Sequence, residues 1–268
     1  MVADQTLQGK VALVTGASGG LGAHFAHVLA RQGAEVVLTA RRLDKVEAEA
    51  RAICEAGGRA HARALDVTNV AEIGPLFDAV AAEIGPVSIL INNAGVGGEG
   101  RALDLTPEAW DQAFDVNVRG VFFCAQAAAR RMIDGGIAES GDGRIVNIAS
   151  IASHTVLPGL PAYCASKAAV AMLTRSLGRE WARHGIAVNA LCPGYVETDI
   201  NGAWFATEAG QRQIKGFPRR RLMEASDPDA ALPMLPGPAA RAITGTLITI
   251  HDVQPLPRRP VRPPATGP

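Results

Sequence analysis

Short, largely apolar runs recur along the chain and alternate with stretches of helical sequence. Val11–Thr15, Glu35–Ala40 and Val87–Ile91 are three such runs, each bounded by turn-forming residues. A short apolar run between turn signals is typical of a strand that is buried on both faces of a parallel sheet. The alternation therefore predicts strands joined by helical crossovers.

Strand and helix alternate along most of the chain. The predicted strands are Val11–Thr15, Glu35–Ala40, Arg59–Leu65, Val87–Ile91, Arg144–Ala149, Ile186–Cys192 and Ala242–Ile250. The predicted helices run from after Gly22 to about Gln32, over Leu43–Glu55 and Val70–Ile84, from Pro107 to about Met132, and over Pro161–His184. This order predicts an α/β fold, a single Rossmann-like, doubly wound parallel sheet of about seven strands with helices on both faces. Ligands in such sheets bind beyond the carboxyl ends of the strands.

A glycine-rich turn joins the first strand to the first helix. It reads Thr15-Gly16-Ala17-Ser18-Gly19-Gly20-Leu21-Gly22. Glycines let the backbone approach a phosphate closely, and the helix N-terminus offers free N–H groups and a positive potential. A glycine-rich turn alone is a weak motif, but its place between this strand and this helix favours a dinucleotide site.

The second strand ends at Arg41 and Arg42 instead of an acidic residue. Sites that select NAD usually place a carboxylate here, whereas arginine suits a 2′-phosphate. We therefore expect NADP(H), with NAD(H) as the second choice. The alternative is that both arginines are solvated residues at the start of the next helix.

Polar and small residues follow several of the other strands. Asp66 either accepts a hydrogen bond from an adenine or starts a helix, and the sequence favours neither role over the other. Asn92 and Asn93 are suited to hydrogen-bond loose backbone groups at a strand end, and Ser150 follows the fifth strand. Since the carboxyl ends of parallel strands lie at one edge of the sheet, we expect these polar residues to line a single cleft.

Tyr163 and Lys167 are four residues apart in the predicted helix 161–184, so both side chains leave the same face. An ammonium beside a phenol favours the phenolate, and we expect the pKa of Tyr163 to be lowered from about 10. Such a tyrosine takes or gives a proton at a carbonyl or alcohol oxygen. An isolated pair with this spacing is more often an ordinary exposed pair, but the dinucleotide features favour the chemical role.

The composition limits the partners of the chain. Its 268 residues include 26 basic and 26 acidic side chains, which predicts no nucleic-acid or membrane partner. We expect no membrane span and no secretory signal. The four cysteines, Cys54, Cys124, Cys164 and Cys192, are far apart, which indicates a reduced, cytoplasmic protein. The sequence has no histidine and cysteine cluster with metal-ligand spacing, so we expect no metal site.

Taken in order, these motifs closely resemble those of the short-chain dehydrogenase/reductase family over roughly residues 8–200. The resemblance implies that Tyr163 is the general acid/base and that Ser150 polarises the substrate oxygen. It also implies that Lys167 binds the nicotinamide ribose and lowers the pKa of Tyr163. Asn117 would hold a water in a proton relay. The reaction implied is hydride transfer between the cofactor and a carbonyl or secondary alcohol.

The same resemblance implies the cofactor and substrate contacts. The cofactor would contact Gly16, Ser18, Gly20, Leu21, Gly22, Arg41, Arg42, Asp66, Val67, Asn93, Ala94, Gly95, Tyr163, Lys167, Pro193, Gly194, Val196 and Thr198. A substrate lid is implied at about 199–217. The substrate pocket would be formed by Ser150, Ser153, His154, Leu157, Tyr195, Trp204 and Phe205. Packing or a subunit contact is an equally good explanation for the two lid aromatics, and a solvated loop position is the better one for His154.

The C-terminal region departs from the family. Pro233, Pro236 and Pro238 fall where a helix precedes the last strand in the family, so we expect that helix to be short, broken or displaced. We expect one catalytic domain over 1–254 and a disordered Pro/Arg-rich tail over 255–268. Because this region often packs between subunits in the family, a tetramer is in doubt. A homodimer through the helices near 106–132 and 161–184 is expected instead.

Three functions are compatible with the sequence. The first is an NADP(H)-dependent carbonyl reductase or secondary-alcohol dehydrogenase. The second is a reductase of 3-oxoacyl thioesters carried by acyl carrier protein or CoA. For the second, the neutral net charge offers no broad basic surface, although Arg219-Arg220-Arg221 is a local basic patch. The third is a nucleotide-sensing protein without catalysis, which the intact Tyr163 and Lys167 disfavour.

Overall fold

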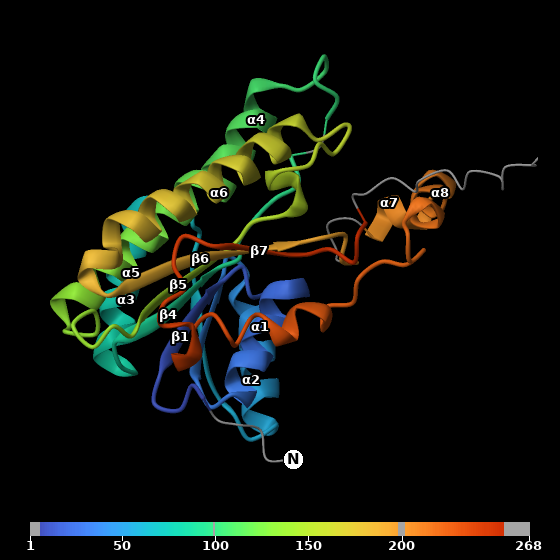
Figure 1. Cartoon of the computed structure of the whole chain (residues 1–268). Coiled ribbons are helices and arrows are strands. Elements are labelled where there is room, and N and C mark those ends of the chain that lie inside the picture. The colour runs from blue at the N-terminus through green and yellow to red at the C-terminus, as the bar shows by residue number, and fades with distance from the viewer. Residues whose placement is uncertain (1–5, 99, 198–201, 255–268) are drawn as a thin grey trace, which may run out of the picture.

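A computed structural model describes residues 6–98, 100–197 and 202–254 of the chain. Seven strands form one sheet in the order β3-β2-β1-β4-β5-β6-β7, and all neighbouring pairs are parallel (Figure 1). The strands are β1 (Val11–Thr15), β2 (Glu35–Ala40), β3 (Arg59–Ala64), β4 (Val87–Asn92), β5 (Gly143–Ile148), β6 (Ile186–Pro193) and β7 (Leu247–Ile250). The predicted fold class is confirmed.

Helices cover both faces of the sheet (Figure 1). One apolar core lies between the sheet and α1 (Gly20–Arg31) with α2 (Leu43–Glu55), and Phe25 and Ile53 are among its buried members. A second core lies between the opposite face and α3 (Val70–Glu83), α5 (Val121–Asp134) and α6 (Pro161–Trp181). The two cores account for the continuously apolar strands, because each strand between them buries both of its faces.

Local signals located most element ends correctly. Helix α2 has the predicted bounds, and α1 ends at Arg31 with Gly33 at φ +92° behind it. The Thr106 hydroxyl caps α4 (Pro107–Phe114) by accepting a hydrogen bond from the Ala109 amide. Gly185 has a left-handed φ of 73° after α6 and the short 3-10 turn that follows it.

The predicted seventh strand, Ala242–Ile250, was too long. Strand β7 begins only at Leu247, because the preceding residues form a turn with Gly245 at φ +68°. The hydroxyl of Thr244 accepts a hydrogen bond from the Val188 amide at 3.1 Å, in place of a backbone acceptor. Side-chain and turn hydrogen bonds therefore replace strand pairing over these residues.

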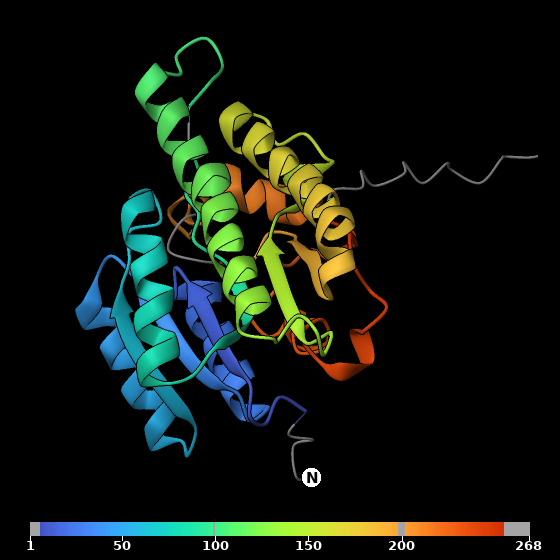
Figure 2. The same ribbon diagram turned by 90° about the vertical axis from the view of Figure 1, so that its left-hand side faces the viewer.

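The single helix predicted from Pro107 to about Met132 is divided by a π-helical segment, η1 (Asp115–Gly120). Figure 2 shows α4, η1 and α5 as one green rod beside the yellow α6. Gly120 is needed here, since a Cβ on it would lie 2.9 Å from the Val67 side chain. Single π-helical turns of this kind occur frequently at functional sites.

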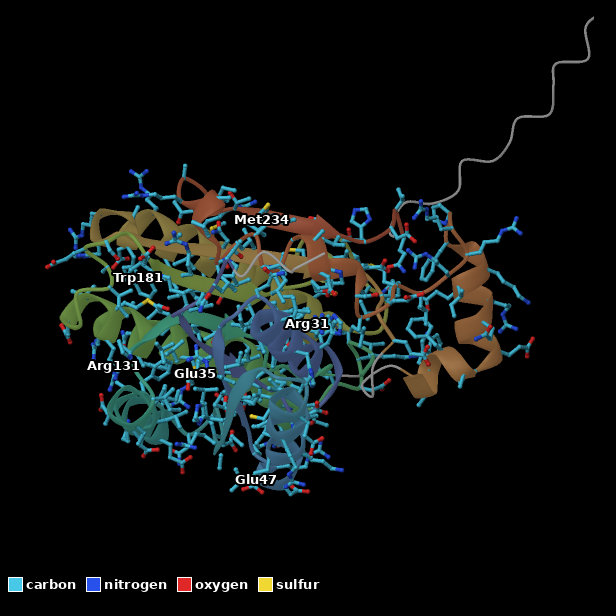
Figure 3. All side chains as sticks on the ribbon, turned by 90° about the horizontal axis from the view of Figure 1, so that it is seen from below. Arg31, Glu35, Glu47, Arg131, Trp181 and Met234 are labelled. Atoms are coloured by element: carbon cyan, nitrogen blue, oxygen red, sulfur yellow. The ribbon has the colours of Figure 1, made fainter. Side chains whose placement is uncertain are left out.

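The helix expected before β7 is broken, as predicted from its prolines. Two short 3-10 turns, η4 (Asp227–Ala230) and η5 (Pro238–Ala240), stand in its place. Leu232 and Leu235 between them are still fully buried in the core beside α1 and α2. Met234, which lies between these two leucines in the sequence and is labelled in Figure 3, is exposed. The segment thus keeps its apolar contacts with single helical turns in place of a continuous helix.

Helices α7 (Gly202–Ala206) and α8 (Glu208–Gly216) lie beyond the carboxyl ends of the strands (Figure 1). They occupy most of the predicted lid, 199–217. Thr198, the first residues of that lid and the predicted tail 255–268 lie outside the described residues. None of the helices described is both long and apolar enough to cross a membrane.

Candidate active site

Four side chains from three parts of the chain meet near the carboxyl end of β5. Ser150 lies two residues beyond that strand and is buried. Tyr163 and Lys167 are on the first turns of α6, and Asn117 lies in the π-helical segment η1. The structure therefore brings together the four residues that the motifs single out.

Lys167 is deeply buried for a charged side chain. Its Nζ donates a hydrogen bond to the Ile148 carbonyl at 2.8 Å, and burial lowers its pKa to about 8. The same Nζ lies 5.7 Å from the centre of the Tyr163 ring. The ammonium is thus held beside the phenol ring by a main-chain carbonyl.

The expected lowering of the pKa of Tyr163 is not what the side chains produce. Burial raises that pKa above its usual value, and a hydrogen bond from Ser150 opposes the rise. Desolvation disfavours the phenolate, whereas a hydrogen bond to it favours the charged form. The sequence argument was wrong here because it counted the nearby ammonium and not the loss of water around the phenol.

Asn117 uses its side-chain amide to join three segments. The Oδ1 accepts a hydrogen bond from the Val96 amide at 2.8 Å. The Nδ2 donates to the Val96 carbonyl and to the Ser166 hydroxyl, both at 3.0 Å. Both amide hydrogens therefore have protein acceptors. A mid-helix asparagine is unfavourable for helix formation, and these contacts explain its presence.

The glycine-rich turn is packed against the loop after β4. A Cβ on Gly16 would lie 2.7 Å from the Ala94 Cα, and Gly16 has a φ of +66°. A Cβ on Gly22 would lie 2.3 Å from the Gly16 carbonyl oxygen. The side-chain Nδ2 of Asn93 donates to the carbonyls of Thr15 and Gly16 at 3.1 and 3.0 Å. This confirms the prediction that Asn93 hydrogen-bonds backbone groups at the strand end. No side chain caps the first turn of α1, so the backbone there fits a phosphate.

Thr15 has a role here that the motif analysis missed. Its buried Oγ1 accepts hydrogen bonds from the amides of Asn93 and Ala94 at 3.0 and 3.1 Å. These contacts join the ends of the neighbouring strands β1 and β4. The glycine-rich motif that begins at Thr15 does not reveal these contacts, because they join segments 78 residues apart in the chain.

The adenine end of the predicted cofactor site is more open. Arg41 and Arg42 are exposed, and the Arg42 guanidinium donates to the Ser18 hydroxyl at 3.5 Å. Asp66 accepts from the amide and hydroxyl of Thr68 at 3.0 and 2.8 Å, so one carboxylate oxygen is used in a local turn. Val67 is buried beside it.

The wall next to Tyr163 is mostly apolar. Leu157 is buried in a small cluster that Tyr163, Cys164 and Tyr195 also contact. The Ser153 hydroxyl donates to the Lys167 carbonyl at 2.8 Å, so it braces α6. His154 is exposed, in agreement with the solvated loop position considered for it.

The two lid aromatic residues assigned to the substrate pocket, Trp204 and Phe205, differ in their surroundings. Phe205 is buried, with its ring 5.6 Å from that of Tyr195 in an edge-to-face arrangement. Phe217 stacks on the same tyrosine at 5.3 Å. Trp204 is half exposed, and its indole nitrogen donates to Gln213 at 2.9 Å. The ring contacts to Tyr195 therefore come from the two phenylalanines and not from Trp204.

Gln254 was missed because no local pattern marks it. It is buried and accepts a hydrogen bond from the Tyr195 amide at 2.6 Å. Its Nε2 donates to the carbonyls of Tyr195 and Arg221 at 3.2 and 3.3 Å. A Cβ on Gly194 would lie 2.2 Å from its Oε1. Gln254 thus contacts the main chain on both sides of the predicted lid.

The remaining predicted nicotinamide contacts lie along the same edge. Pro193 is the last residue of β6, and the Gly194 amide donates to the Ile250 carbonyl at 2.7 Å. Val196 is buried and pairs with Met223 in a single parallel bridge.

Within the described ranges, no group of three or more histidine, cysteine or acidic side chains is placed to hold a metal.

Comparison with known proteins identifies the family. Residues 10–209 match the short chain dehydrogenase family, and the chain belongs to it. It is 39% identical over 203 residues to gluconate 5-dehydrogenase of Gluconobacter oxydans, covering 76% of this chain and 77% of that protein. It is 35% identical over 246 residues to the 3-oxoacyl-[acyl-carrier-protein] reductase of Vibrio cholerae, covering 91% and 97%.

A solved structure agrees with this assignment. The gluconate 5-dehydrogenase of Burkholderia cenocepacia, in complex with NADP and tartrate, superposes with a TM-score of 0.87 at 33% identity. The match covers 94% of this chain and 97% of that one. The chain is therefore an oxidoreductase that transfers a hydride between a nicotinamide cofactor and a carbonyl or alcohol.

Proposed function

We propose that this chain is an NADP(H)-dependent reductase of apolar ketones, or the corresponding secondary-alcohol dehydrogenase, with Tyr163 as its general acid/base. The observation that carries the proposal is the meeting of Ser150, Tyr163 and Lys167 at one strand end, with Ser150 hydrogen-bonded to the phenol. The bound nicotinamide supplies or accepts the hydride.

The side chains have distinct parts in the proton transfer. Ser150 binds the substrate oxygen and favours the charged form of Tyr163. Tyr163 gives its proton to that oxygen in reduction and takes it back in oxidation. Lys167, held by the Ile148 carbonyl, keeps a positive charge near the phenol and is placed to meet the cofactor ribose. Asn117 fixes the loop at Val96 beside them.

The substrate class follows from the cleft wall. Leu157, Tyr195 and Phe205 present apolar surface near the phenol, and the acidic or basic side chains among the predicted pocket residues are limited to the exposed His154. An apolar wall favours a ketone with aliphatic or aromatic substituents.

The test of the chemistry is the Tyr163→Phe variant. We expect turnover to fall by about 10³-fold, within the usual range for loss of a general acid/base. Cofactor binding and the circular dichroism spectrum should be unchanged, because the ring remains. Retention of more than a small fraction of turnover would remove Tyr163 from this role.

NADP(H) is proposed over NAD(H) from the exposed Arg41 and Arg42 at the end of β2. The presence of NADP in the Burkholderia structure supports this choice. Titration with NADPH and NADH, on wild type and on Arg41→Ala, tests it. A preference for NADPH that falls by about 10-fold or more in the variant is expected from loss of a charge-assisted phosphate contact. Arg51→Ala, an exposed arginine on α2, is the matched control.

Reduction of 3-oxoacyl thioesters is the second candidate. It is favoured by the 35% sequence identity to the Vibrio cholerae reductase over 91% of this chain. Comparison of kcat/KM for an acetoacetyl thioester with that for simple aryl ketones separates the two. Preference for the thioester by 10-fold or more, about 1.4 kcal/mol of transition-state binding, would make this the better assignment.

We also infer a cytoplasmic homodimer, with one catalytic domain that includes the lid. Trp110 on α4 and Met172 on α6 are exposed hydrophobic residues on the two helices expected at the interface. Light scattering after gel filtration tests the state. If α6 is in the interface, Met172→Glu should yield a monomer. A tetrameric wild-type protein would show that a second surface also takes part in assembly.

A further inference from the structure

A large cavity lies at the end of the sheet opposite the proposed active site. Its volume is about 650 Å³, and it lies where β5 and β6 begin. In Figure 3, Trp181, which precedes one of its lining segments, is at the end of the molecule far from α7 and α8. The volume is within the range of about 300–1,000 Å³ that small-molecule sites have.

The charged residues of its lining are mainly basic. Arg144, Arg183 and Arg241 line the cavity together with His184, and Glu139 is the one acid among the lining residues. Nε of Arg183 donates to the Nε2 of His184 at 3.1 Å, so that imidazole acts as an acceptor. Among the described residues, none of the three arginines forms a salt bridge. The lining of the cavity therefore has an excess of positive charge, which Asp142, outside the lining and paired with Lys10, offsets only in part at Arg144.

Arg144 is the strongest sign of a missing partner. Only 3% of its surface is exposed, and its Nε has no hydrogen-bond acceptor. Its Nη1 donates to the carbonyls of Gly141 and Gly143 at 2.6 and 3.0 Å, which fixes the guanidinium at the cavity wall. A buried charged donor without an acceptor is unfavourable. An anion in the cavity would remove that penalty.

Arg241 approaches the same place from the other side of the chain. The position of a Cβ on Gly141 would be 3.6 Å from its Nη2, so the guanidinium lies over the turn that Arg144 contacts. Burial is the main cause that lowers the pKa of Arg144; the nearby Asp142 carboxylate opposes this shift, and the like charge of Arg241 adds to it. Two guanidinium groups that converge in this way match the oxygens of a phosphate or carboxylate.

We propose that this cavity binds a small molecule that carries a phosphate or carboxylate group, held by Arg144, Arg183 and Arg241. The site is separate from the cofactor cleft, which lies beyond the opposite ends of the strands. It does not depend on the identity of the substrate or on the choice between NADP and NAD.

Calorimetric titration of the full chain with inorganic phosphate and with citrate tests the proposal. The Arg41→Ala background is used, so that the expected nucleotide 2′-phosphate contact does not contribute to the measured heat. We expect at least one anion to bind with a Kd of about 1 mM or lower. Stronger binding of phosphate would indicate a phosphorylated ligand, and stronger binding of citrate a polycarboxylate.

Variants of the less buried arginines keep the test independent of folding. Arg241→Gln and Arg183→Gln should each weaken binding by about 10-fold, by loss of one charge-assisted contact. Arg179→Gln, an exposed arginine on α6 that does not line the cavity, should bind as the background does. Unchanged binding in both cavity variants would overturn the proposal. So would the absence of measurable heat for both anions, or equal heat from chloride.

Discussion

Replacing Gln254 tests whether this side chain stabilises the segment that contains the predicted lid. The side chain contacts the main chain of Tyr195 and of Arg221, which lie before α7 and after α8. Gln254→Ala removes all three hydrogen bonds and keeps the backbone. Gln254→Glu keeps the acceptor for the Tyr195 amide but places a carboxylate oxygen against two carbonyls.

The magnitude follows from these three contacts. Each intramolecular hydrogen bond contributes about 1 kcal/mol net, so Gln254→Ala should cost about 3 kcal/mol. The loss should fall mainly on local opening of the segment and not on global unfolding, because the lid is joined to the sheet core by few elements. An opening free energy lower by about 3 kcal/mol raises the opening constant by about 100-fold.

Hydrogen exchange of the native protein measures this directly. The amide of Met223, bonded to the Tyr195 carbonyl at 2.9 Å, should lose about 100-fold of its protection in Gln254→Ala. Amides of β4 and β5 should keep theirs. KM for the ketone should rise more than kcat falls, because the proposed lid would cover the substrate and take no part in proton transfer.

The reasoning would be refuted by uniform loss of protection across the sheet, since Gln254 would then stabilise the whole fold. It would also fail if Gln254→Glu matched wild type in both exchange and KM. That outcome would mean that the two carbonyl contacts contribute nothing, and that one acceptor at the Tyr195 amide is sufficient.

Three further predictions concern the rest of the site. Ser150→Ala should lower kcat by about 10²-fold and raise the pKa of Tyr163 seen in the pH–rate profile, because the opposing hydrogen bond is lost; an unchanged profile would argue against the Ser150 contact. Lys167, with a folded pKa of about 8 against 10.5, makes the folded state less stable while it is charged, and this penalty is relieved as pH rises from about 8 to 10.5. The stability advantage of Lys167→Met over wild type should therefore shrink by about 3 kcal/mol across that window in urea unfolding, and a constant difference would contradict the lowered pKa. Gly22→Ala should lower the free energy of unfolding by about 1–3 kcal/mol and abolish NADPH binding, since its Cβ would meet the Gly16 carbonyl at 2.3 Å. Gly216→Ala is the control, because there is open space around that position, and it should unfold as wild type does.

Local patterns were sufficient for most of the elements and for a set of candidate proton-transfer groups. The apolar runs located the strands, and the turn Gly16–Gly22 located the start of α1. Tyr163 and Lys167 could be paired because helical geometry alone places residues four apart on one face. These features depend on neighbours in the chain, so they can be derived from it directly.

Burial and distant contacts were decided only by the tertiary structure. The pKa of Tyr163 is set chiefly by lost solvation, which depends on every segment packed around the phenol. The π-helical turn at Asn117 depends on hydrogen bonds to Val96, 21 residues away. Gln254 contacts Tyr195 across 59 residues.

The chain by itself thus determined the fold class, the order of its elements and which side chains are available for hydride-transfer chemistry. The tertiary structure decided the proton affinities of those side chains, what holds the lid, and that three arginines from separate segments line one cavity. The physical reason is that helix and strand propensity act over a few residues. Desolvation, packing and charge convergence depend on groups that only the folded chain brings together.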